Sequence, residues 1–253
     1  MYRKFLPKVE KKRAVFLKSV SKKTLFHQDI VFLVWNVYKK NHDMEWIKEF
    51  KKIISLYHPD IMLFQESSVD FKINPIGSYT HYGYIFFSNF SFKQKSFGLL
   101  SAAKSKITNF DSVFSIHKEP LLKTPKMILA TKYYLNNREK LLVINVHLIN
   151  FVKTEKFIAQ LKQLEELCLS HKGALVIGGD FNTWNKKRIN LLFDLAKKLK
   201  LKKVEFSSEN NKKNIFKQPL DHIFYRGLRL KNSVILDFCK SSDHKPLIAA
   251  FCT

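Results

Sequence analysis

The chain has 253 residues, of which 45% are hydrophobic and 26% charged, so it can bury a large core and is expected to form one α/β domain. Apolar runs such as Ile30 to Trp35 are far shorter than the roughly 18 residues that span a bilayer, and no apolar segment follows the basic N-terminus as in a secretory signal. Three cysteines without metal-ligand spacing indicate a reducing compartment. We therefore expect a cytoplasmic monomer with no obligate protein partner.

Residues 1–28 are predicted to form a basic arm, and residues 29–253 a single domain without repeats or a flexible linker. The domain is predicted to mix apolar strands with amphipathic helices. In chain order the strands are "DIVFLVWN", "DIMLFQE", "SFGLLSAAKS", "KMILATKYYL", "KLLVINVHLI", "ALVI", "LDHIFYRG" and the segment after "SSDHKP". The helices are predicted at residues 45–57, 158–167 and 188–200.

Polar side chains stand at or just past the ends of several of these strands. They are Asn36, Glu66, His147, Asp180, Asn182, Asp221, Asp243 and His244. One such residue alone indicates only where a chain emerges into water, but strands that share a sheet bring their ends to one edge, where the side chains would form a pocket. Carboxylate and amide oxygens suit a hard divalent cation such as Mg²⁺, and histidines beside carboxylates can transfer protons.

Six motifs in order, "WNVY", "DIMLFQE", "NVHLI", "GGDFN", "LDHIF" and "SSDHKP", resemble the endonuclease/exonuclease/phosphatase (DNase I-like) superfamily between about residues 31 and 251. Within it, "VWNVYK", "LSAAKS", "HLINF" and "PLDHIFYRG" are similar to the YafD-type bacterial branch. The resemblance implies a four-layer α/β sandwich in which two mixed β-sheets lie face to face with helices outside.

The resemblance also implies a divalent metal, Mg²⁺ or Mn²⁺. Glu66 would be its main carboxylate ligand, Asn36 a second ligand or a donor to a phosphate oxygen, and Asp243 would lie near the metal through water. Gly178 and Gly179 would let the backbone turn sharply and approach the phosphate closely.

The remaining polar residues receive roles in hydrolysis by the same resemblance. Asp180 would orient or deprotonate the attacking water, and Asn182 would hold the scissile phosphate. His244 would act as general acid/base or bind a phosphoryl oxygen, with Asp221 fixing its tautomer. His147 would donate to the phosphate from the opposite side.

Three further residues are weaker candidates. Lys104 and Lys126 lie in motifs that match the branch and could reach a phosphate, although a solvated role is the simpler interpretation for any one lysine here. Glu119 is the only nearby candidate for an acidic partner of His147. The aromatic residues between positions 79 and 97 could stack on unpaired bases, but core packing explains most of them more simply.

The charge balance indicates the partner. Forty-five Lys and Arg against 21 Asp and Glu give a formal net charge of +24, which attracts polyanions. Nine basic residues precede residue 24 and eight lie within residues 185–203. Because most are lysines, the surface suits a nucleic-acid backbone better than base-specific readout. An anionic lipid is the second possible partner, and a generally solvated basic surface is the simplest alternative.

These features together predict a divalent-metal-dependent phosphodiesterase, foremost a nuclease that hydrolyses nucleic-acid phosphodiester bonds by activated-water attack. The alternative enzymes are a phospholipid head-group phosphodiesterase and an inositol phosphatase. A non-catalytic nucleic-acid-binding protein with the same fold is the alternative from another class. The complete set of polar residues argues against that last possibility, and assays with Mg²⁺ and with chelator separate it from an enzyme.

Overall fold

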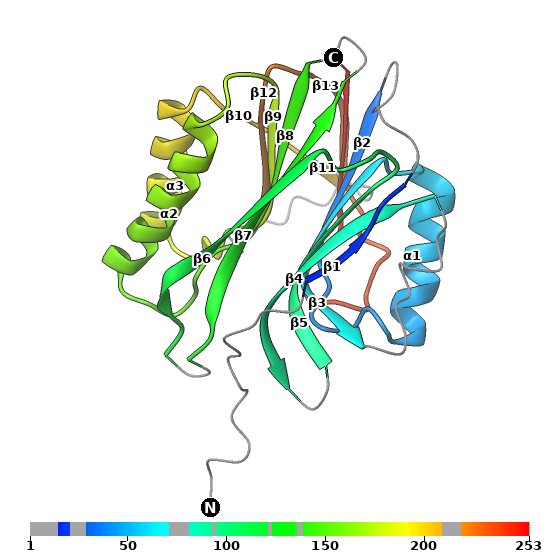
Figure 1. Cartoon of the computed structure of the whole chain (residues 1–253), viewed down its shortest axis with the longest axis horizontal. Helices are drawn as coiled ribbons and strands as arrows, with labels where there is room; N and C mark the ends of the chain where they lie inside the picture. The colour runs from blue at the N-terminus through cyan, green and yellow to red at the C-terminus, as the bar shows by residue number, and fades with distance from the viewer. Residues whose placement is uncertain are drawn as a thin grey trace, which may run out of the picture.

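A computed structural model describes residues 15–20, 29–70, 81–92, 95–120, 123–135, 139–208 and 219–252. These residues form two β-sheets and three helices. The sheets face each other and the helices lie on their outer faces, so the molecule has four layers (Figure 1). The predicted α/β sandwich is confirmed. Within the described ranges, no helix is long and apolar enough to cross a membrane.

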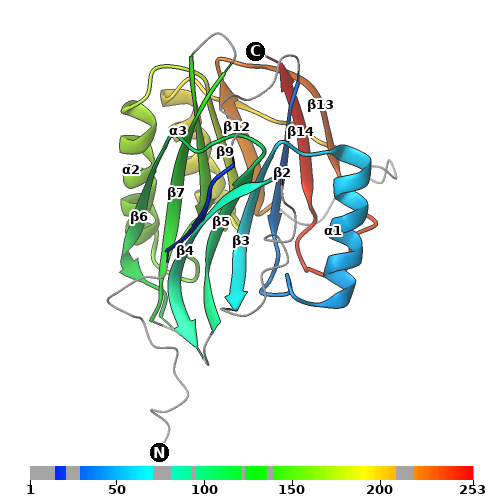
Figure 2. The same ribbon diagram turned by 45° about the vertical axis from the view of Figure 1, so that its right-hand side comes forward.

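The first sheet has eight strands in the order β1-β4-β5-β3-β2-β14-β13-β11. Their bounds are β1 Val15–Lys18, β2 Ile30–Asn36, β3 Ile61–Asp70, β4 Gly83–Phe92, β5 Lys95–Ala103, β11 Ser207–Ser208, β13 Arg229–Ile235 and β14 Leu247–Cys252. Strands β2 and β3 are parallel, and α1 (Met44–Tyr57) connects them across the outer face of the sheet (Figure 2).

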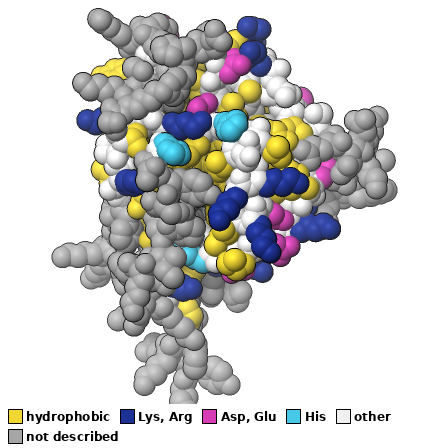
Figure 3. All heavy atoms as spheres, turned by 90° about the vertical axis from the view of Figure 1, so that its right-hand side faces the viewer, with side chains coloured by type: hydrophobic (Ala, Val, Ile, Leu, Met, Phe, Trp, Pro, Cys, Tyr) yellow, Lys and Arg dark blue, Asp and Glu magenta, His cyan; other side chains and the backbone are white. Residues whose placement is uncertain are grey.

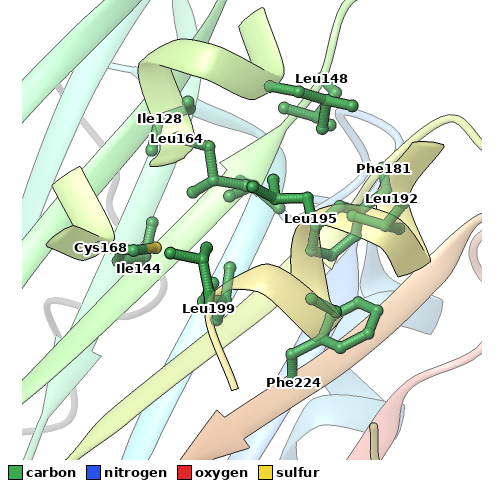
Figure 4. Close-up of a cluster of buried hydrophobic side chains, with 14 of the residues drawn as sticks. Ile128, Ile144, Leu148, Leu164, Cys168, Phe181, Leu192, Leu195, Leu199 and Phe224 are labelled. Carbon is green, nitrogen blue, oxygen red and sulfur yellow. The ribbon is translucent and has the colours of Figure 1, made fainter. Parts of the chain in front are cut away.

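The second sheet has six strands in the order β10-β12-β9-β8-β7-β6. Their bounds are β6 Asn109–Lys118, β7 Pro125–Tyr134, β8 Lys140–His147, β9 Leu175–Asp180, β10 Lys202–Lys203 and β12 Asp221–Arg226. Helices α2 (Thr154–Leu169) and α3 (Lys186–Lys198) cover its outer face. Apolar side chains of the sheet and both helices, including Ile144, Leu164, Leu195 and Phe224, fill the layer between them (Figure 4).

The alternation of side chains along β2 explains why this strand is apolar on both faces. Phe32 and Val34 face the layer between the two sheets, whereas Leu33 and Trp35 face α1. Trp35 stacks on Trp46 of that helix with ring centroids 5.4 Å apart. Successive residues of a strand point to opposite faces, so a strand inside a sandwich needs a continuous apolar run.

Each predicted strand and helix has a counterpart in the fold. The sequence did not predict β1, β4, β6, β10, β11 or β13. Strand β1 lies inside the predicted basic arm and pairs antiparallel with β4, so the arm is not wholly separate from the domain. In the aromatic region, Tyr82 and Phe86 are buried core residues, as the simpler interpretation holds; Tyr79 lies outside the described residues.

The two glycines of β9 have a different role from the predicted one. A Cβ on Gly178 would lie 2.8 Å from a methyl group of Val34 in the facing sheet, and a Cβ on Gly179 would lie 2.0 Å from the Val146 carbonyl oxygen. Gly179 also has a φ of 145°, which side chains disfavour. Both glycines therefore serve close packing inside the sandwich, rather than a turn that approaches a phosphate.

A buried amide pair joins the two sheets. The Gln65 side chain of β3 donates to Asn145 Oδ1 of β8 at 2.7 Å. The Asn145 amide nitrogen lies 3.2 Å from the Phe64 carbonyl oxygen and 3.0 Å from that of Leu100. Both amide side chains are fully buried. Since unpaired polar groups are costly inside a protein, this network favours one alignment of the sheets.

Replacing Asn145 by Ala should destabilise the fold. The change removes donors from buried carbonyl groups and an acceptor from Gln65, and each buried group left unpaired costs about 1–3 kcal/mol. The free energy of unfolding, measured by urea denaturation, should fall by at least about 2 kcal/mol. Asn232→Ala is the matched control, because Asn232 is exposed and its side-chain oxygen accepts the N–H of the adjacent Ser233. Equal stabilities of the two variants would contradict the prediction.

Candidate active site

The ends of three neighbouring strands bring three predicted site residues side by side. His147 at the end of β8 is in register with Asp180 at the end of β9, and Asp180 is in register with Asp221 at the start of β12. Asn36 and Glu66 approach from β2 and β3 of the facing sheet. Between the sheets lies a pocket of about 340 Å³. Of the predicted residues, Asn36, Glu66, Glu119, Lys126, His147, Asp180, Asn182, Asp243 and His244 line it.

Glu66 projects into this pocket from an irregularity in β3. The pairing of β3 with β5 shifts register between Phe64 and Ser67, and Glu66 has a φ of 50°, a left-handed conformation unusual for a residue other than glycine. Its carboxylate pairs with Lys39 and lies 3.8 Å from Lys126 Nζ. Burial alone would raise the pKa of Glu66, but the surrounding cations lower it to about 2.

Asp180 is held by two donors. Asn36 Nδ2 donates to its Oδ2 at 3.0 Å, and the Asn182 backbone N–H donates to its Oδ1 at 2.9 Å. The amide oxygen of Asn36 accepts the Tyr38 backbone N–H at 3.1 Å. Burial and the nearby Asp221 carboxylate raise the pKa of Asp180 above its ordinary value. Asn36 is therefore placed to orient Asp180, and its predicted role toward metal or phosphate stays a prediction.

Asp221 and His244 form the short ion pair that the sequence predicts. His244 Nδ1 lies 2.6 Å from Asp221 Oδ2, and the His244 carbonyl oxygen accepts Trp35 Nε1–H at 3.0 Å. Burial opposes protonation of the imidazole, but Asp221, with Asp180 and Asp243, raises the pKa of His244 to about 10. The pairing with Asp221 therefore favours the protonated imidazole at His244.

The pKa of His147 is shifted in the opposite direction from that of His244. Its Nε2 lies 3.4 Å from Asp180 Oδ2 and 3.9 Å from Glu66 Oε1. Burial, followed by the charge of Lys126, lowers the pKa of His147 well below its ordinary value. The pocket therefore holds one neutral and one charged imidazole, which can accept and donate protons respectively.

Asn182 and Asp243 complete the polar lining. Asn182 has a φ of 51°, and its Nδ2 donates to the Leu148 carbonyl oxygen at 2.8 Å. A primary amide carries two N–H groups, so a second remains for a phosphate oxygen. Asp243 is exposed at the pocket, and its Oδ1 lies 3.4 Å from Ser242 Oγ.

The structure places two weaker candidates away from their predicted roles. Lys104 pairs with Asp60 at 3.1 Å. Asp60 lies six residues before Glu66, a distance of about 20 Å along an extended strand. Lys104 therefore neutralises a carboxylate outside the pocket. Glu119 accepts the Asn150 N–H at 2.9 Å and lies 3.6 Å from Lys126. His147 Nε2 instead lies near the carboxylates of Asp180 and Glu66, at 3.4 Å and 3.9 Å. Lys126 lines the pocket as expected.

Two pocket features were missed by the sequence analysis. Lys39, which pairs with Glu66, has a left-handed φ of 62° and lines the pocket. Arg188, counted among the basic surface residues, is buried and donates to the carbonyl groups of Ile149 and Asn182. Nothing in one sequence distinguishes such residues from the many solvated cations around them.

The donor set suits a hard divalent cation. Glu66 supplies an ionised, pocket-facing carboxylate, and Asp243 a second one at the opening. Asp180, Asp221 and His244 also come within 4.8 Å of one another, but the hydrogen bond between His244 Nδ1 and Asp221 identifies that group as a charge-assisted pair. One or two carboxylates, completed by water and phosphate, are typical of a Mg²⁺ site in an enzyme.

The fold and the site define a class. The family model described as "Endonuclease/Exonuclease/phosphatase family" matches residues 33–244, and this chain belongs to that family, whose members are metal-dependent phosphodiesterases, nucleases and phosphatases.

The relatives similar in sequence include UPF0294 proteins, which belong to the YafD-type branch that the motifs predict. One from Vibrio parahaemolyticus is 38% identical over 229 residues, covering 88% of this chain and 78% of the relative. One from Erwinia tasmaniensis is 31% identical over 226 residues, covering 87% and 80%. Among solved structures, the human Nocturnin catalytic domain with bound sulfate matches with a TM-score of 0.68 at 20% identity, covering 94% of this chain and 98% of that one. Truncated Caenorhabditis elegans TDP2 matches with a TM-score of 0.61 at 18% identity, covering 89% and 98%.

His222, next to Asp221, is a core residue rather than a pocket residue. Its Nε2 lies 2.8 Å from Thr183 Oγ1, and its ring packs against Phe181 and Phe224. Burial, followed by the charge of Lys203, lowers the pKa of His222 to about 4. The folded protein therefore resists protonation of this ring.

The stability of the protein should fall in mild acid because of His222. The unfolded chain takes up the proton near pH 6.5 and the folded chain only near pH 4. The stability that depends on neutral His222 is therefore intact above pH 6.5 and is lost as the pH falls toward 4. When the pH is lowered from 7 to 4.5, the free energy of unfolding should fall by roughly 2.5 kcal/mol less in His222→Gln than in wild type. Urea denaturation at both pH values measures the two changes. His81→Gln, which alters an exposed ring, is the control. Identical losses in all three proteins would refute the prediction.

Proposed function

We propose that this protein is a Mg²⁺- or Mn²⁺-dependent phosphodiesterase that hydrolyses nucleic-acid phosphodiester bonds. The observation that carries the proposal is the meeting of Glu66, His147, Asp180 and the Asp221–His244 pair around one pocket. Hydrolysis at phosphorus requires a carboxylate to hold a cation, a second carboxylate to activate water, and donors such as two imidazoles to bind the phosphate. Family membership supports the same reaction class.

Glu66 would hold the cation, with Asp243 beside it through water. When bound, a divalent cation neutralises phosphate charge and stabilises the charge that develops on the phosphoryl oxygens. Lys39, which pairs with the Glu66 carboxylate, also lines the pocket and would offer a positive charge to the phosphate. Lys126 already stands between Glu66 and Glu119 and offers a fixed positive charge to the same group.

Asp180 and His244 would divide the proton transfers. Asp180, oriented by Asn36 and the Asn182 N–H, accepts a proton from the water whose oxygen bonds to phosphorus. His244, held by Asp221, donates a proton to the oxygen that leaves as its bond to phosphorus breaks. His147 and the second amide N–H of Asn182 bond to the other phosphate oxygens and stabilise the charge that grows there.

The substrate class rests on charge. A net charge of +24 favours a polyanion over a small phosphate ester. In the 185–203 cluster, Lys186, Lys187, Lys197, Lys198, Lys200 and Lys202 are exposed. On the face that carries α1, the described Lys and Arg side chains are interspersed with acidic and hydrophobic ones (Figure 3), which suits backbone attraction spread over the surface better than one base-reading patch.

A parallel activity screen tests the proposal. Purified protein with Mg²⁺ or Mn²⁺ should release products from plasmid DNA, single-stranded DNA, RNA or an abasic duplex, and chelator should abolish the release. Release from sphingomyelin or inositol phosphates alone would overturn the nucleic-acid assignment. Binding to nucleic acid without turnover of any substrate would identify a non-catalytic protein.

Removing the charge of Glu66 should abolish both metal binding and turnover. Glu66→Gln keeps the shape of the side chain but withdraws the ionised carboxylate, so Mn²⁺ binding measured by calorimetry and hydrolysis should both disappear while the circular dichroism spectrum is retained. Glu45→Gln, an exposed change on α1, should behave like wild type. A Glu66→Gln protein that hydrolyses substrate in the presence of chelator would end the metal hypothesis.

The three residues that act on water and phosphate should each be needed. His147→Ala, Asp180→Asn and His244→Ala should each lower kcat on the order of a hundredfold or more. Because they serve one transition state, combining two changes should cost less than the product of the single effects. His81→Ala, outside the pocket, is the control. Near-wild-type rates for all three variants would refute the site assignment.

A further inference from the structure

Two large aromatic side chains are exposed at the rim of the pocket. Phe151 is 74% exposed and Trp184 is 48% exposed. They follow site residues closely in the chain, since Phe151 comes four residues after His147 and Trp184 two residues after Asn182. Phe151 and its neighbour Asn150 line the pocket itself. The aromatic pair thus borders the place where a scissile phosphate would lie.

Asn150 locks both aromatic residues in place. Its Oδ1 accepts Trp184 Nε1–H at 2.8 Å and the Phe151 backbone N–H at 2.8 Å, and its own backbone N–H donates to Glu119 Oε1. Phe151 has a left-handed φ of 50°. A bulky residue holds that conformation only when its surroundings enforce it, and such enforcement is characteristic of functional sites.

Arg188 supports the pair from inside the protein. This arginine is 2% exposed, and its guanidinium donates to the carbonyl oxygens of Ile149 and Val152, on either side of Asn150 and Phe151. It donates also to the Asn182 carbonyl oxygen and lies 5.2 Å from the centre of the Trp184 ring. One buried cation therefore fixes both loops that carry the aromatic residues.

We propose that Phe151 and Trp184 form a stacking surface for an unpaired nucleobase next to the scissile phosphate, an inference that rests on the proposed nuclease function. Bases stack on aromatic side chains without regard to sequence, which matches a lysine-rich surface suited to backbone attraction. The Trp184 ring and the Phe151 backbone are already held by hydrogen bonds to Asn150, so the pair loses little freedom when a base binds.

The same anchoring argues against insertion of the pair into a lipid surface. An indole at a membrane interface buries its ring in the apolar region and directs its N–H to the wet headgroups. In this protein the Trp184 N–H is bound to Asn150 and the ring lies beside the Arg188 guanidinium. A ring tied to the protein at its polar edge presents a fixed surface rather than a free anchor.

Tryptophan fluorescence tests the stacking surface directly. The chain has three tryptophans, of which Trp35 and Trp46 are at most 1% exposed, so a ligand that stacks on Trp184 should quench the exposed component of the emission. The probes are a ten-nucleotide single-stranded oligothymidylate and an abasic oligonucleotide of the same length and charge, both in chelator so that neither is cleaved. Wild type should bind the thymidylate about tenfold more tightly than the abasic chain, with quenching by the thymidylate alone.

The variants separate stacking from charge. Phe151→Ala and Trp184→Ala should each lose most of the preference for the base-containing chain while retaining affinity for the abasic one, and Trp184→Ala should also lose the quenching. Tyr134→Ala is the matched control, because Tyr134 is an exposed aromatic at the end of β7 far from Lys126, and it should keep both.

Equal wild-type affinity for the two oligonucleotides would overturn the inference, and so would a preference that survives both variants. Quenching by phosphatidylserine vesicles but not by the thymidylate would overturn it in favour of a lipid surface. These outcomes are distinct from failure of the proposed function. A protein that cleaves DNA without base preference loses only the stacking surface, whereas one that stacks the thymidylate but hydrolyses no nucleic acid loses only the nuclease assignment.

Discussion

The buried contact between Gln65 and Asn145 sets the geometry on which the pocket depends. Gln65 immediately precedes Glu66 on β3, and Asn145 lies two residues before His147 on β8. Residues two apart on a strand share a face, so one hydrogen bond between the sheets helps to align the Glu66 carboxylate with the His147 imidazole across the pocket. Their closest atoms lie 3.9 Å apart. A polar pair inside an apolar layer thus specifies how the two sheets are aligned, whereas hydrophobic packing alone specifies this alignment only weakly.

The pocket contains two groups of charges of opposite sign, each built from residues of both sheets. Lysines surround the Glu66 carboxylate, whereas carboxylates surround the His244 imidazole. The first arrangement keeps an acid ionised and the second keeps a base protonated, although both groups are largely buried. A phosphate and a cation entering together would find each charge already compensated, and would exchange protein partners rather than create new unpaired charges.

The sequence predicted those features of the fold and site that depend on local pattern. Continuous apolar runs identified the central strands, and the motifs identified the residues that end them. Features that depend on distant contacts were missed or misread. Arg188 resembles its exposed lysine neighbours until the loops around it are seen, Lys104 has the motif of a phosphate ligand but meets Asp60, and β1 is recognisable only by its pairing with β4. Left-handed conformations at Glu66 and Phe151 have no glycine to signal them.

The two glycines of β9 limit which parts of this fold can change in sequence. At Gly178 the sheets approach so closely that even a methyl group would meet Val34, and at Gly179 it would meet the backbone of β8. The residue that follows is Asp180. Asp180, the carboxylate proposed to activate water, thus follows a tightly packed part of β9, where larger side chains would collide with their neighbours. Differences in substrate among proteins of this fold would therefore arise more readily in the loops around the pocket than in this strand.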